Sequence, residues 1–335
     1  MNLYPLLMAP AFRHGKETPW GGHTLRDVFM KECPDATGES LEVSTLEGYE
    51  SMVANGVHAG KSLTRMVELW GEQLTGPIDG PFPLVLKLLD SQEPTSVHVH
   101  PDDAHARAHG GKLGKNEALV ILNADPGAKM VYGLVPDGME LKAMLDENAV
   151  ESHLRWVNVQ PGDVYYIPAG MVHALGTDIQ CYELQDACDV TYRLFDWNRL
   201  NQGKPRELHP AQALEVADPA LALEKNEGTT VLRKGGSVTY YISNAHFEFC
   251  RLNLSGKMPL PSGRMLLLTP LGECALRWGE ERMDFAPFTT VIVPAALEGV
   301  VLEGSTKVLM SSLPDREALR EELGYRAENV AGLMD

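Results

Sequence analysis

Three short segments of the sequence carry side chains that could bind a divalent metal ion. His98 and His100 are two residues apart, so in a strand both imidazoles lie on one face. A carboxylate, Glu117, follows in the second segment, and His173 ends the third. Three imidazoles with one carboxylate are a familiar ligand set for zinc, iron or manganese. The residue types and their spacing therefore predict a metal site with four ligands: His98, His100, Glu117 and His173.

The third segment has the most specific spacing. It runs Gly162-Asp163-Val164-Tyr165-Tyr166-Ile167-Pro168-Ala169-Gly170-Met171-Val172-His173, and it resembles the second cupin motif without a gap. In that motif the Gly-Asp turn starts a strand, and the Pro-Ala-Gly turn aims the histidine at the barrel interior. The HxH pair and the following glutamate resemble the first cupin motif, although residues 101–114 separate them further than in simple cupins. The resemblance implies a double-stranded β-barrel around the metal.

Apolar patterns near these segments predict that strands carry the ligands. Residues 84–89 form a continuous apolar run with one lysine, as in a strand buried on both faces. Residues 96–100 alternate with period two, which places Ser96 on the face of both histidines. Further strands are expected at 117–122, 164–167 and 179–184. Helices are expected at 141–154, 210–216 and 315–323.

Strand patterns return after about residue 230 and predict a second β-domain. We expect residues 1–225 to form an N-terminal catalytic, metal-binding cupin domain with helical insertions, and residues 226–335 to form a C-terminal degenerate cupin domain without metal. Residues 293–298 stand where a cupin could repeat Pro-x-Gly-x-x-His, but they lack the glycine and the histidine. The predicted fold is therefore mainly β, with two cupin (double-stranded β-helix, or jelly-roll) domains, of which the second is degenerate and binds no metal.

The overall composition restricts the partners. A formal net charge of -17 without any basic run disfavours nucleic-acid binding, so an anionic substrate needs a local cationic pocket. No apolar run reaches the length that spans a bilayer, and the N-terminus lacks the pattern of a signal peptide. The five cysteines contain no CxxC pair, and we interpret them as packing residues. These features predict a cytoplasmic protein that binds neither membranes nor nucleic acid, and they predict no oligomeric state.

Several longer segments point to a known family. They are Trp20-Gly21-Gly22, Gly38-Glu39-Ser40, Lys87-Leu88-Leu89-Asp90, Val99-His100-Pro101-Asp102, Gly114-Lys115-Asn116-Glu117, Pro168-Ala169-Gly170-Met171-Val172-His173-Ala174-Leu175, Glu183-Leu184-Gln185, Asp189-Val190-Thr191-Tyr192-Arg193-Leu194-Phe195-Asp196-Trp197 and Arg206-Glu207-Leu208-His209. Together they resemble the type I mannose-6-phosphate isomerases, especially the short bacterial form. The resemblance implies zinc as cofactor and the interconversion of mannose 6-phosphate and fructose 6-phosphate.

The family's zinc ligands, Gln-x-His, Glu and His, fall on the four residues of the predicted site. His98 stands at the position of the family's Gln, and Leu41 stands where the family usually has Trp. Imidazole is an acceptable zinc ligand, so we expect metal binding to persist. The change also makes the ligand set that of a general cupin, for which Fe²⁺ or Mn²⁺ is an alternative metal, and the change at Leu41 bears on sugar specificity.

Arg193 is the first catalytic and substrate-binding candidate beyond the metal ligands. Its guanidinium suits either the substrate phosphate or the oxygens of an enediolate, and the alternative is a structural ion pair with Asp189 or Asp196. Lys115 lies on the same strand face as Glu117, from which it could assist proton transfer or bind phosphate. These residues are candidates because aldose–ketose isomerisation moves a proton between adjacent carbons through a cis-enediol.

Three more polar residues are candidates for the chemistry. Lys87 interrupts an apolar strand, where burial would lower its pKa and favour catalytic use, unless the side chain extends to solvent. Glu183 is a candidate proton carrier or a partner for Arg193, and Ser96 a candidate donor to the phosphate. The sequence does not identify the catalytic base.

Alternative functions remain open at this point. One is a cupin isomerase of another phosphosugar or an iron-dependent cupin dioxygenase, which the set of three histidines and one glutamate also suits. Another is a non-catalytic sugar-binding cupin. The insertion beside the site also holds His105 and His109, for which both a functional and a structural role are open.

Overall fold

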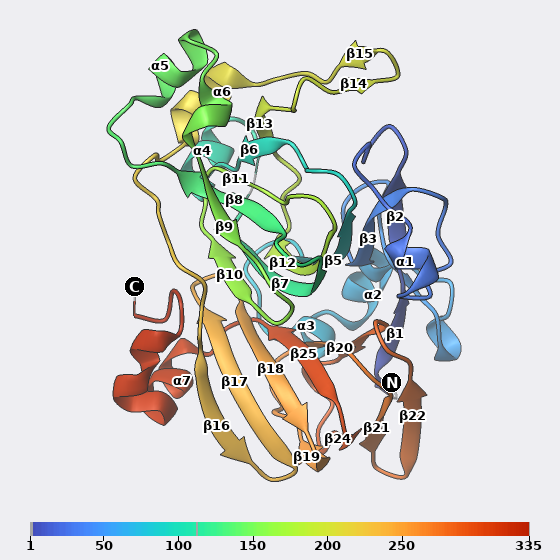
Figure 1. Ribbon diagram of the computed structural model, residues 1–335. Coiled ribbons are helices and arrows are strands. Elements are labelled where there is room, and N and C mark those ends of the chain that lie inside the picture. The colour runs from blue at the N-terminus through green and yellow to red at the C-terminus, as the bar shows by residue number, and fades with distance from the viewer. Residues whose placement is uncertain (1–2, 112, 335) are drawn as a thin grey trace. The chain divides into compact units, whose positions relative to one another are not determined.

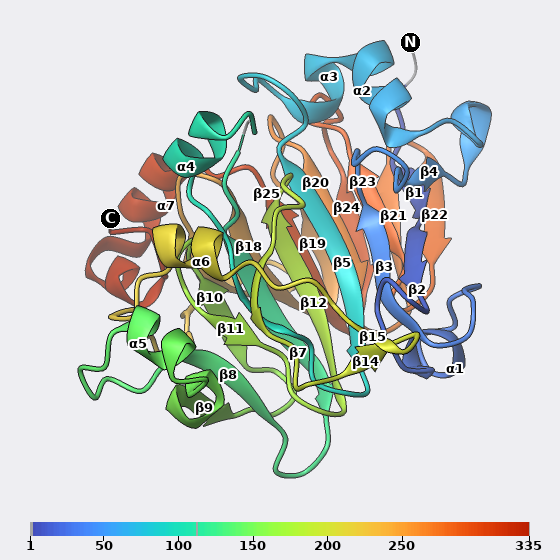
Figure 2. The same ribbon diagram turned by 90° about the horizontal axis from the view of Figure 1, so that it is seen from above.

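The computed structural model describes residues 3–111 and 113–334, and most of its regular structure is antiparallel β-sheet (Figures 1 and 2). Its contacts divide the chain into two compact units. The site unit comprises Phe12–Ser40 and Leu86–Lys225, and the C-terminal unit comprises Met1–Ala11, Leu41–Val85 and Asn226–Asp335. The predicted class, mainly β with a few helices, is confirmed.

The units differ from the expected division into residues 1–225 and 226–335. Both divisions have a boundary at residue 225, but residues 1–11 and 41–85 group with the C-terminal unit. The reason is strand pairing across a long sequence separation. In the C-terminal unit, β1 (Leu6–Ala9) pairs with β23 (Thr290–Val293), and Leu6 lies opposite Ile292. Periodicity along the chain reports a strand but not its partner.

Two antiparallel sheets form the site unit. One has the order β10-β7-β12-β5-β3-β2 and the other β13-β6-β11-β8-β9. The strands of the first are β2 (Ala11–His14), β3 (Thr37–Val43), β5 (Leu84–Ser91), β7 (Glu117–Ala124), β10 (Val164–Ile167) and β12 (Ile179–Asp186). Those of the second are β6 (Val97–Val99), β8 (Lys129–Leu134), β9 (Leu154–Asn158), β11 (His173–Ala174) and β13 (Tyr192–Phe195). A short hairpin, β14 (Leu200–Asn201) and β15 (Lys204–Pro205), follows them.

Alternation along the strands sends side chains of both sheets into a shared interior. On β7, Leu119 and Ile121 enter the same buried cluster as Met130 and Tyr132 of β8. Glu117 lies two residues before Leu119 and so on the same strand face. The interior is therefore apolar along most of its length and polar where Glu117 begins the strand.

The helices of the site unit are short, and they correct one expectation. The helix expected at 141–154 is instead α5 (Leu141–Asp146) followed by a 3₁₀ turn, η2 (Val150–His153). Asn148 between them has φ +53°, a left-handed conformation that ends an α-helix and that asparagine tolerates. The expected helix at 210–216 is α6 (Pro210–Val216). Two helices were not expected, α1 (Thr24–Asp27) and α4 (Asp103–Ala108).

The C-terminal unit is also built from two sheets. Their orders are β16-β17-β18-β25-β20-β23-β1-β4 and β19-β24-β21-β22. The strands not yet given are β4 (Met52–Val53), β16 (Thr229–Arg233), β17 (Gly236–Ser243), β18 (Glu248–Leu254), β19 (Gly256–Pro259), β20 (Leu266–Pro270), β21 (Cys274–Trp278), β22 (Glu281–Phe285), β24 (Val301–Gly304) and β25 (Lys307–Ser312). Leu268 and Met310 of the larger sheet share a buried core with Leu276 and Leu302 of the smaller one.

Helices in this unit follow local capping signals. The expected helix at 315–323 is α7 (Arg316–Leu323), where the Asp315 carboxylate accepts a bond from the Ala318 amide and Gly324 at φ +55° ends the helix. The remaining helical segments are η1 (Gly56–His58), α2 (Leu63–Trp70), α3 (Glu72–Thr75) and η3 (Gly324–Asn329). None of the helices in the described part of the chain is long and apolar enough to cross a bilayer.

All five cysteines are free thiols.

Candidate metal centre

The three predicted histidine ligands converge in the site unit. His98 on β6 and His173 on β11 are direct cross-strand partners, and His100 lies just beyond the end of β6. The ring centroids of His98 and His173 are 4.3 Å apart, and each lies 4.9 or 5.1 Å from that of His100. One ring nitrogen from each histidine lies within 4.8 Å of the other two. Adjacent strands therefore bring the histidines of two separate segments to one point.

Backbone hydrogen bonds fix the orientation of all three imidazoles. Each Nδ1 contacts a carbonyl oxygen, which can only accept, so each Nδ1 carries the proton and each Nε2 keeps its lone pair. The acceptors are Ser96 at 2.6 Å from His98, Val190 at 2.8 Å from His100 and Met171 at 3.0 Å from His173. Metal-binding histidines usually donate their second ring nitrogen in this way. The three Nε2 atoms are thus available as ligands.

Glu117 completes the group. Its Oε1 lies 3.3 Å from Nε2 of His100, and its Oε2 lies 3.0 Å from Nε2 of His173. The Lys115 ammonium is 2.8 Å from the same Oε1 and 3.2 Å from Nε2 of His100. The Glu117 side chain is almost completely buried. A buried carboxylate facing two imidazole lone pairs is a suitable place for a cation.

Burial sets the protonation states that metal binding needs. It lowers the pKa of His98 well below its usual value, and with nearby Lys115 it lowers the pKa of His100 to about 4. Burial alone would raise the pKa of Glu117, but Lys115 and His100 hold that pKa well below its usual range. Near neutral pH His98 and His100 are therefore neutral and Glu117 is ionised, which is the form that binds a divalent metal.

A cavity of about 300 Å³ opens beside this group within the site unit. His98, Glu117 and His173 form part of its wall. All of the catalytic and substrate-binding candidates from the sequence also line it: Lys87, Ser96, Lys115, Glu183 and Arg193. The fold therefore gathers on one cavity residues from β5, β6, β7, β12, β13 and the segments beside them.

Lys87 corrects one prediction. It is buried, as expected, and does not extend to solvent. Burial alone would lower its pKa, but Glu183 at 3.1 Å and Glu39 at 3.5 Å raise the pKa above its usual value. Lys87 is thus a held ammonium ion rather than a neutral amine. Of the two roles considered for Glu183, the pairing with Arg193 is not formed, because the carboxylate lies 3.1 Å from the Lys87 ammonium instead.

Arg193 does not form the alternative ion pairs considered from the sequence. Asp189 accepts two hydrogen bonds from Arg13, at 2.9 and 2.7 Å, while Asp196 pairs with Arg199 at 2.6 Å. Among the described residues no carboxylate lies within ion-pair distance of Arg193, which donates to the Glu207 backbone oxygen at 2.7 Å. Its remaining donors are free to meet an anion in the cavity.

Sequence reasoning missed several charged residues of the cavity wall. Arg206 lies there beside Arg193, and burial together with that neighbouring charge lowers its pKa to about 10. Arg13 lies there as well and is 3.5 Å from Glu39. A signal for Arg206 existed, since it opens the Arg206-Glu207-Leu208-His209 segment. Arg13 gave no such signal, because it stands in a separate segment whose strand pairing the sequence does not report.

Comparisons with known proteins agree with this arrangement. The family model described as phosphomannose isomerase type I, catalytic domain, matches residues 13–120. Mannose-6-phosphate isomerase ManA of Bacillus subtilis is 34% identical over 321 residues, which cover 93% of this chain and 100% of that protein. Mannose-6-phosphate isomerase of Streptococcus mutans is 31% identical over 300 residues, which cover 87% of this chain and 94% of that protein.

Solved structures show the same fold. The crystal structure of mannose 6-phosphate isomerase from Bacillus subtilis superposes with a TM-score of 0.86 at 31% identity, covering 92% of this chain and 99% of that one. A zinc-bound mannose 6-phosphate isomerase superposes with a TM-score of 0.74, covering 93% of this chain and 100% of that one. Because its identity is 14%, this second likeness concerns the fold alone.

The fold and the site define a cupin protein with a set of candidate metal ligands inside its β-barrel. The relatives narrow this class, since identity above 30% extends over about nine-tenths of the chain. The chain belongs to the type I mannose-6-phosphate isomerase family. The resemblance seen in the sequence is thereby confirmed.

Proposed function

We propose that this chain interconverts mannose 6-phosphate and fructose 6-phosphate with zinc as its metal. The observation that carries the proposal is one cavity that combines three imidazoles and Glu117 with lysine and arginine side chains. A sugar phosphate needs both features, namely a centre that acts on its hydroxyl and carbonyl oxygens and cations for its phosphate. In a chain of net charge -17, such a local group of cations is what attracts an anion.

The donor set fits zinc. Neutral imidazoles with free Nε2 atoms and an ionised carboxylate are its common ligands. The residues that would hold the ion are His98, His100, Glu117 and His173. When bound, zinc supplies a fixed positive charge that stabilises negative charge on a substrate oxygen, and it adds no redox chemistry that the reaction does not need.

Arg193 and Arg206 form the proposed phosphate end of the cavity. Both guanidinium groups are largely buried and lie near each other. Arg206 is 3.6 Å from Asp196, whereas no carboxylate of the described residues lies within ion-pair distance of Arg193. A phosphate dianion relieves this repulsion and accepts two charge-assisted bonds from each planar guanidinium. Ser96 on the same wall adds a neutral donor.

Glu183 is the proposed proton carrier of a cis-enediol route. It removes the proton from C2 of the aldose while the C–H electron pair forms the C1–C2 double bond and the C1=O π electrons move to O1. When an electron pair of O2 then forms the C2=O bond, the C1–C2 π electrons take the proton back from Glu183 at C1. The hydroxyl proton of O2 passes to O1, so the change leaves the redox state of the whole molecule unaltered. Lys87 at 3.1 Å holds the carboxylate in position, and Lys115 is the cation nearest to the proposed ligands. Burial raises the pKa of Glu183 even beside Lys87, which suits a proton carrier.

Turnover measured with both sugar phosphates tests the proposal directly. We expect isomerisation in both directions and one zinc ion in the inner site, which is the group of His98, His100, Glu117 and His173. We also expect solvent deuterium to be incorporated at the carbon that exchanges its proton. Zinc bound in that site with no turnover of either sugar would falsify the proposal. Incorporation that is absent at every stage of the reaction would argue for hydride transfer in place of an enediol.

The same measurements separate the alternatives. Turnover of a different phosphosugar alone would favour another cupin isomerase, and oxygen consumption by the iron-loaded protein would favour a dioxygenase. Tight binding of sugar phosphate without turnover, unchanged in Arg193→Ala, would favour a sugar-binding cupin. A cytoplasmic location stays a prediction from the sequence.

A further inference from the structure

A second group of potential ligands lies outside the cavity. His105 on α4 and His109 at the end of that helix stack their rings, with centroids 4.0 Å apart and planes inclined by 23°. Glu215 of α6 lies against both of them. The helices α4 and α6 lie side by side in both views of the molecule (Figures 1 and 2). One ligand atom from each of the three residues lies within 4.8 Å of the other two.

Hydrogen bonds leave one nitrogen of each ring free, and both free nitrogens face the same carboxylate. Nδ1 of His109 donates to the backbone oxygen of His105 at 2.9 Å, so its Nε2 keeps the lone pair. Nε2 of His105 bonds the Tyr192 hydroxyl at 3.3 Å, which leaves Nδ1 as the free nitrogen when the ring donates. Each free nitrogen is 3.9 Å from the same oxygen, Oε2 of Glu215.

These distances are too long for direct hydrogen bonds and close to those across a bound metal ion. Two ligand atoms at tetrahedral positions around zinc lie about 3.4 Å apart, given metal–ligand distances of about 2.1 Å. A closure of about half an ångström by the carboxylate would bring its oxygen to that distance from each nitrogen, and the two nitrogens themselves lie within 4.8 Å of each other. Glu215 can supply this closure, because its side chain is 56% exposed and its only ion-pair partners among the described residues are the two histidines. His105, only 13% exposed, is the fixed member of the group.

The surroundings hold the two histidines in place. The Asp102 carboxylate accepts a bond from the His105 amide at 2.7 Å and so caps α4. The Asp103 carboxylate accepts a bond from the Gly114 amide at 2.7 Å, which ties the far end of the insertion to the start of α4. A helix fixed at its start presents positions i and i+4 on one face, as His105 and His109 are.

We propose that His105, His109 and Glu215 form a second, outer binding site for a divalent transition metal of the zinc or cobalt class. Two imidazoles and a carboxylate favour these ions over magnesium or calcium, and water completes the coordination. The site binds more weakly than the inner one because it is exposed and has only three protein ligands. The proposal is independent of the isomerase activity.

Counting bound metal tests the outer site. Zinc-loaded protein is dialysed until only tightly held metal remains and is then titrated with Co²⁺, followed by its visible absorption and by calorimetry. We expect one further ion per chain, with the spectrum of a nitrogen-ligated centre. His109→Ala and Glu215→Gln should each abolish that second event and keep the inner zinc and the turnover of the unchanged protein. Both side chains are largely exposed, so these variants should fold.

His23→Ala is the matched control. His23 also pairs an exposed imidazole with a carboxylate, Asp35 at 3.3 Å, but within the described part of the chain it belongs to no group of three potential ligands. It should retain the second event. The proposal is overturned if the unchanged protein binds no further ion, or if His109→Ala and Glu215→Gln still bind it. Loss of the event in His23→Ala alone would point to ordinary surface binding and would also overturn the proposal.

Discussion

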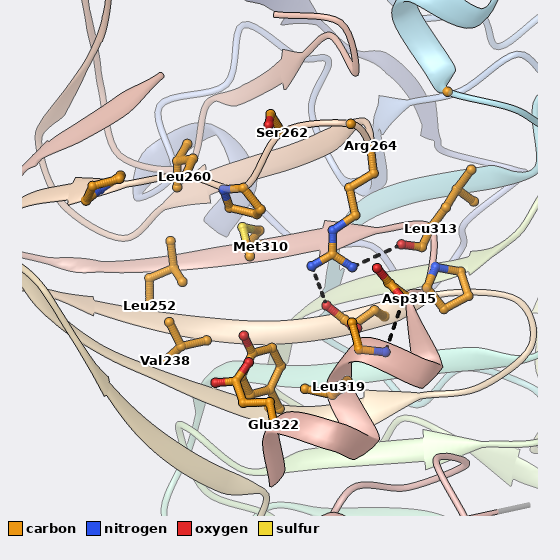
Figure 3. Close-up of a pocket in the computed structure, with 18 of the residues that line it drawn as sticks. Val238, Leu252, Leu260, Ser262, Arg264, Met310, Leu313, Asp315, Leu319 and Glu322 are labelled. Carbon is orange, nitrogen blue, oxygen red and sulfur yellow. Dashed lines mark hydrogen bonds and ion pairs between the residues drawn. The ribbon is translucent and has the colours of Figure 1, made fainter. Parts of the chain in front are cut away.

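The two units of the molecule contain cavities of different character. The cavity of the site unit is about 300 Å³ and holds imidazoles, carboxylates, lysines and arginines. The cavity of the C-terminal unit is about 730 Å³, and apolar side chains such as Leu252 and Met310 form much of its wall (Figure 3). Its charged wall includes Arg264, which pairs with Glu248 at 3.0 Å and extends toward Leu313 in Figure 3. The two units are thus both built from two antiparallel sheets, but the side chains that their strands direct into the interior differ in polarity.

The difference arises at alternate strand positions. In the site unit, β7 places Glu117 and then Leu119 on the cavity wall. In the C-terminal unit, β18 begins with Glu248, but Leu252 and Leu254 on the same face belong to the apolar core. Among the described residues of the C-terminal unit, no three potential metal ligands lie close together. That the C-terminal domain is a degenerate cupin without a metal stays a prediction from the sequence.

The same dipeptide, Pro-Ala, forms a turn after one strand of each unit, and the two turns have different roles. Both β10 and β23 are followed by Pro-Ala. After β10, Gly170 adopts φ +88°, and its amide donates to the His100 backbone oxygen at 2.9 Å. A side chain there would be strained and would approach the Val216 carbonyl oxygen to 3.1 Å. After β23, the Ala295 amide donates instead to the Leu74 backbone oxygen at 2.9 Å. The first turn thus supports a ligand histidine, and the second supports a helix end.

The largest effect should come from removing a ligand of the inner site. His173→Ala takes away one Nε2 donor, and we expect kcat to fall by on the order of 10³ or more, because the main charge stabilisation is lost. Metal content measured by elemental analysis should fall with it. His246→Ala, a histidine of the C-terminal unit, is the control and should leave both unchanged. Loss of metal in the control variant would contradict the division of roles between the units.

The next effect in size concerns the two buried glutamates paired with cations, Glu183 in the site unit and Glu248 in the C-terminal unit. We expect Glu183→Gln to lower kcat by about 10²–10⁴, the usual contribution of a general base, while zinc content stays unchanged. Glu248→Gln should leave kcat unchanged and lower the thermal midpoint, because Arg264 loses its partner. Kinetics and thermal denaturation of both variants measure this contrast. Equal kcat values for the two variants would remove the proposed role of Glu183.

Much of the architecture, and the candidate ligands that it brings together, could be predicted from local patterns. The i, i+2 spacing of His98 and His100 and the gapless segment ending at His173 need only strand geometry and turn chemistry. The protonation of Lys87 could not be predicted, because its partners Glu39 and Glu183 come from other strands. Which strands pair is decided by packing across the whole unit, and a single sequence does not report it. The same limit hid the grouping of residues 1–11 and 41–85 with the C-terminal unit.

A smaller effect should separate the arginines of the two cavities. Arg206→Ala removes a charge-assisted contact to phosphate, worth about 2 kcal/mol, so we expect KM for the sugar phosphate to rise about 30-fold with kcat less affected. Arg264→Ala leaves Glu248 buried without its cation and should destabilise the fold by about 3 kcal/mol with no change in KM. Steady-state kinetics and denaturant unfolding of both variants distinguish these outcomes. A change of KM in Arg264→Ala would show that the C-terminal cavity also contributes to substrate binding.

The smallest effect should come from His98→Gln, which restores the residue that the family usually has at this position. The amide oxygen of glutamine can replace the imidazole as a neutral ligand, so the metal ion keeps four protein ligands. We therefore expect metal affinity to fall by about tenfold and kcat to fall by a smaller factor. His98→Ala offers no ligand and should lose considerably more of both. Competition with a zinc chelator, together with turnover at saturating zinc, compares the two variants. The order of the two variants carries the argument, since it depends on whether residue 98 supplies a ligand atom. If glutamine and alanine were equally damaging, the residue at position 98 would act through its shape and its bond to the Ser96 backbone oxygen instead.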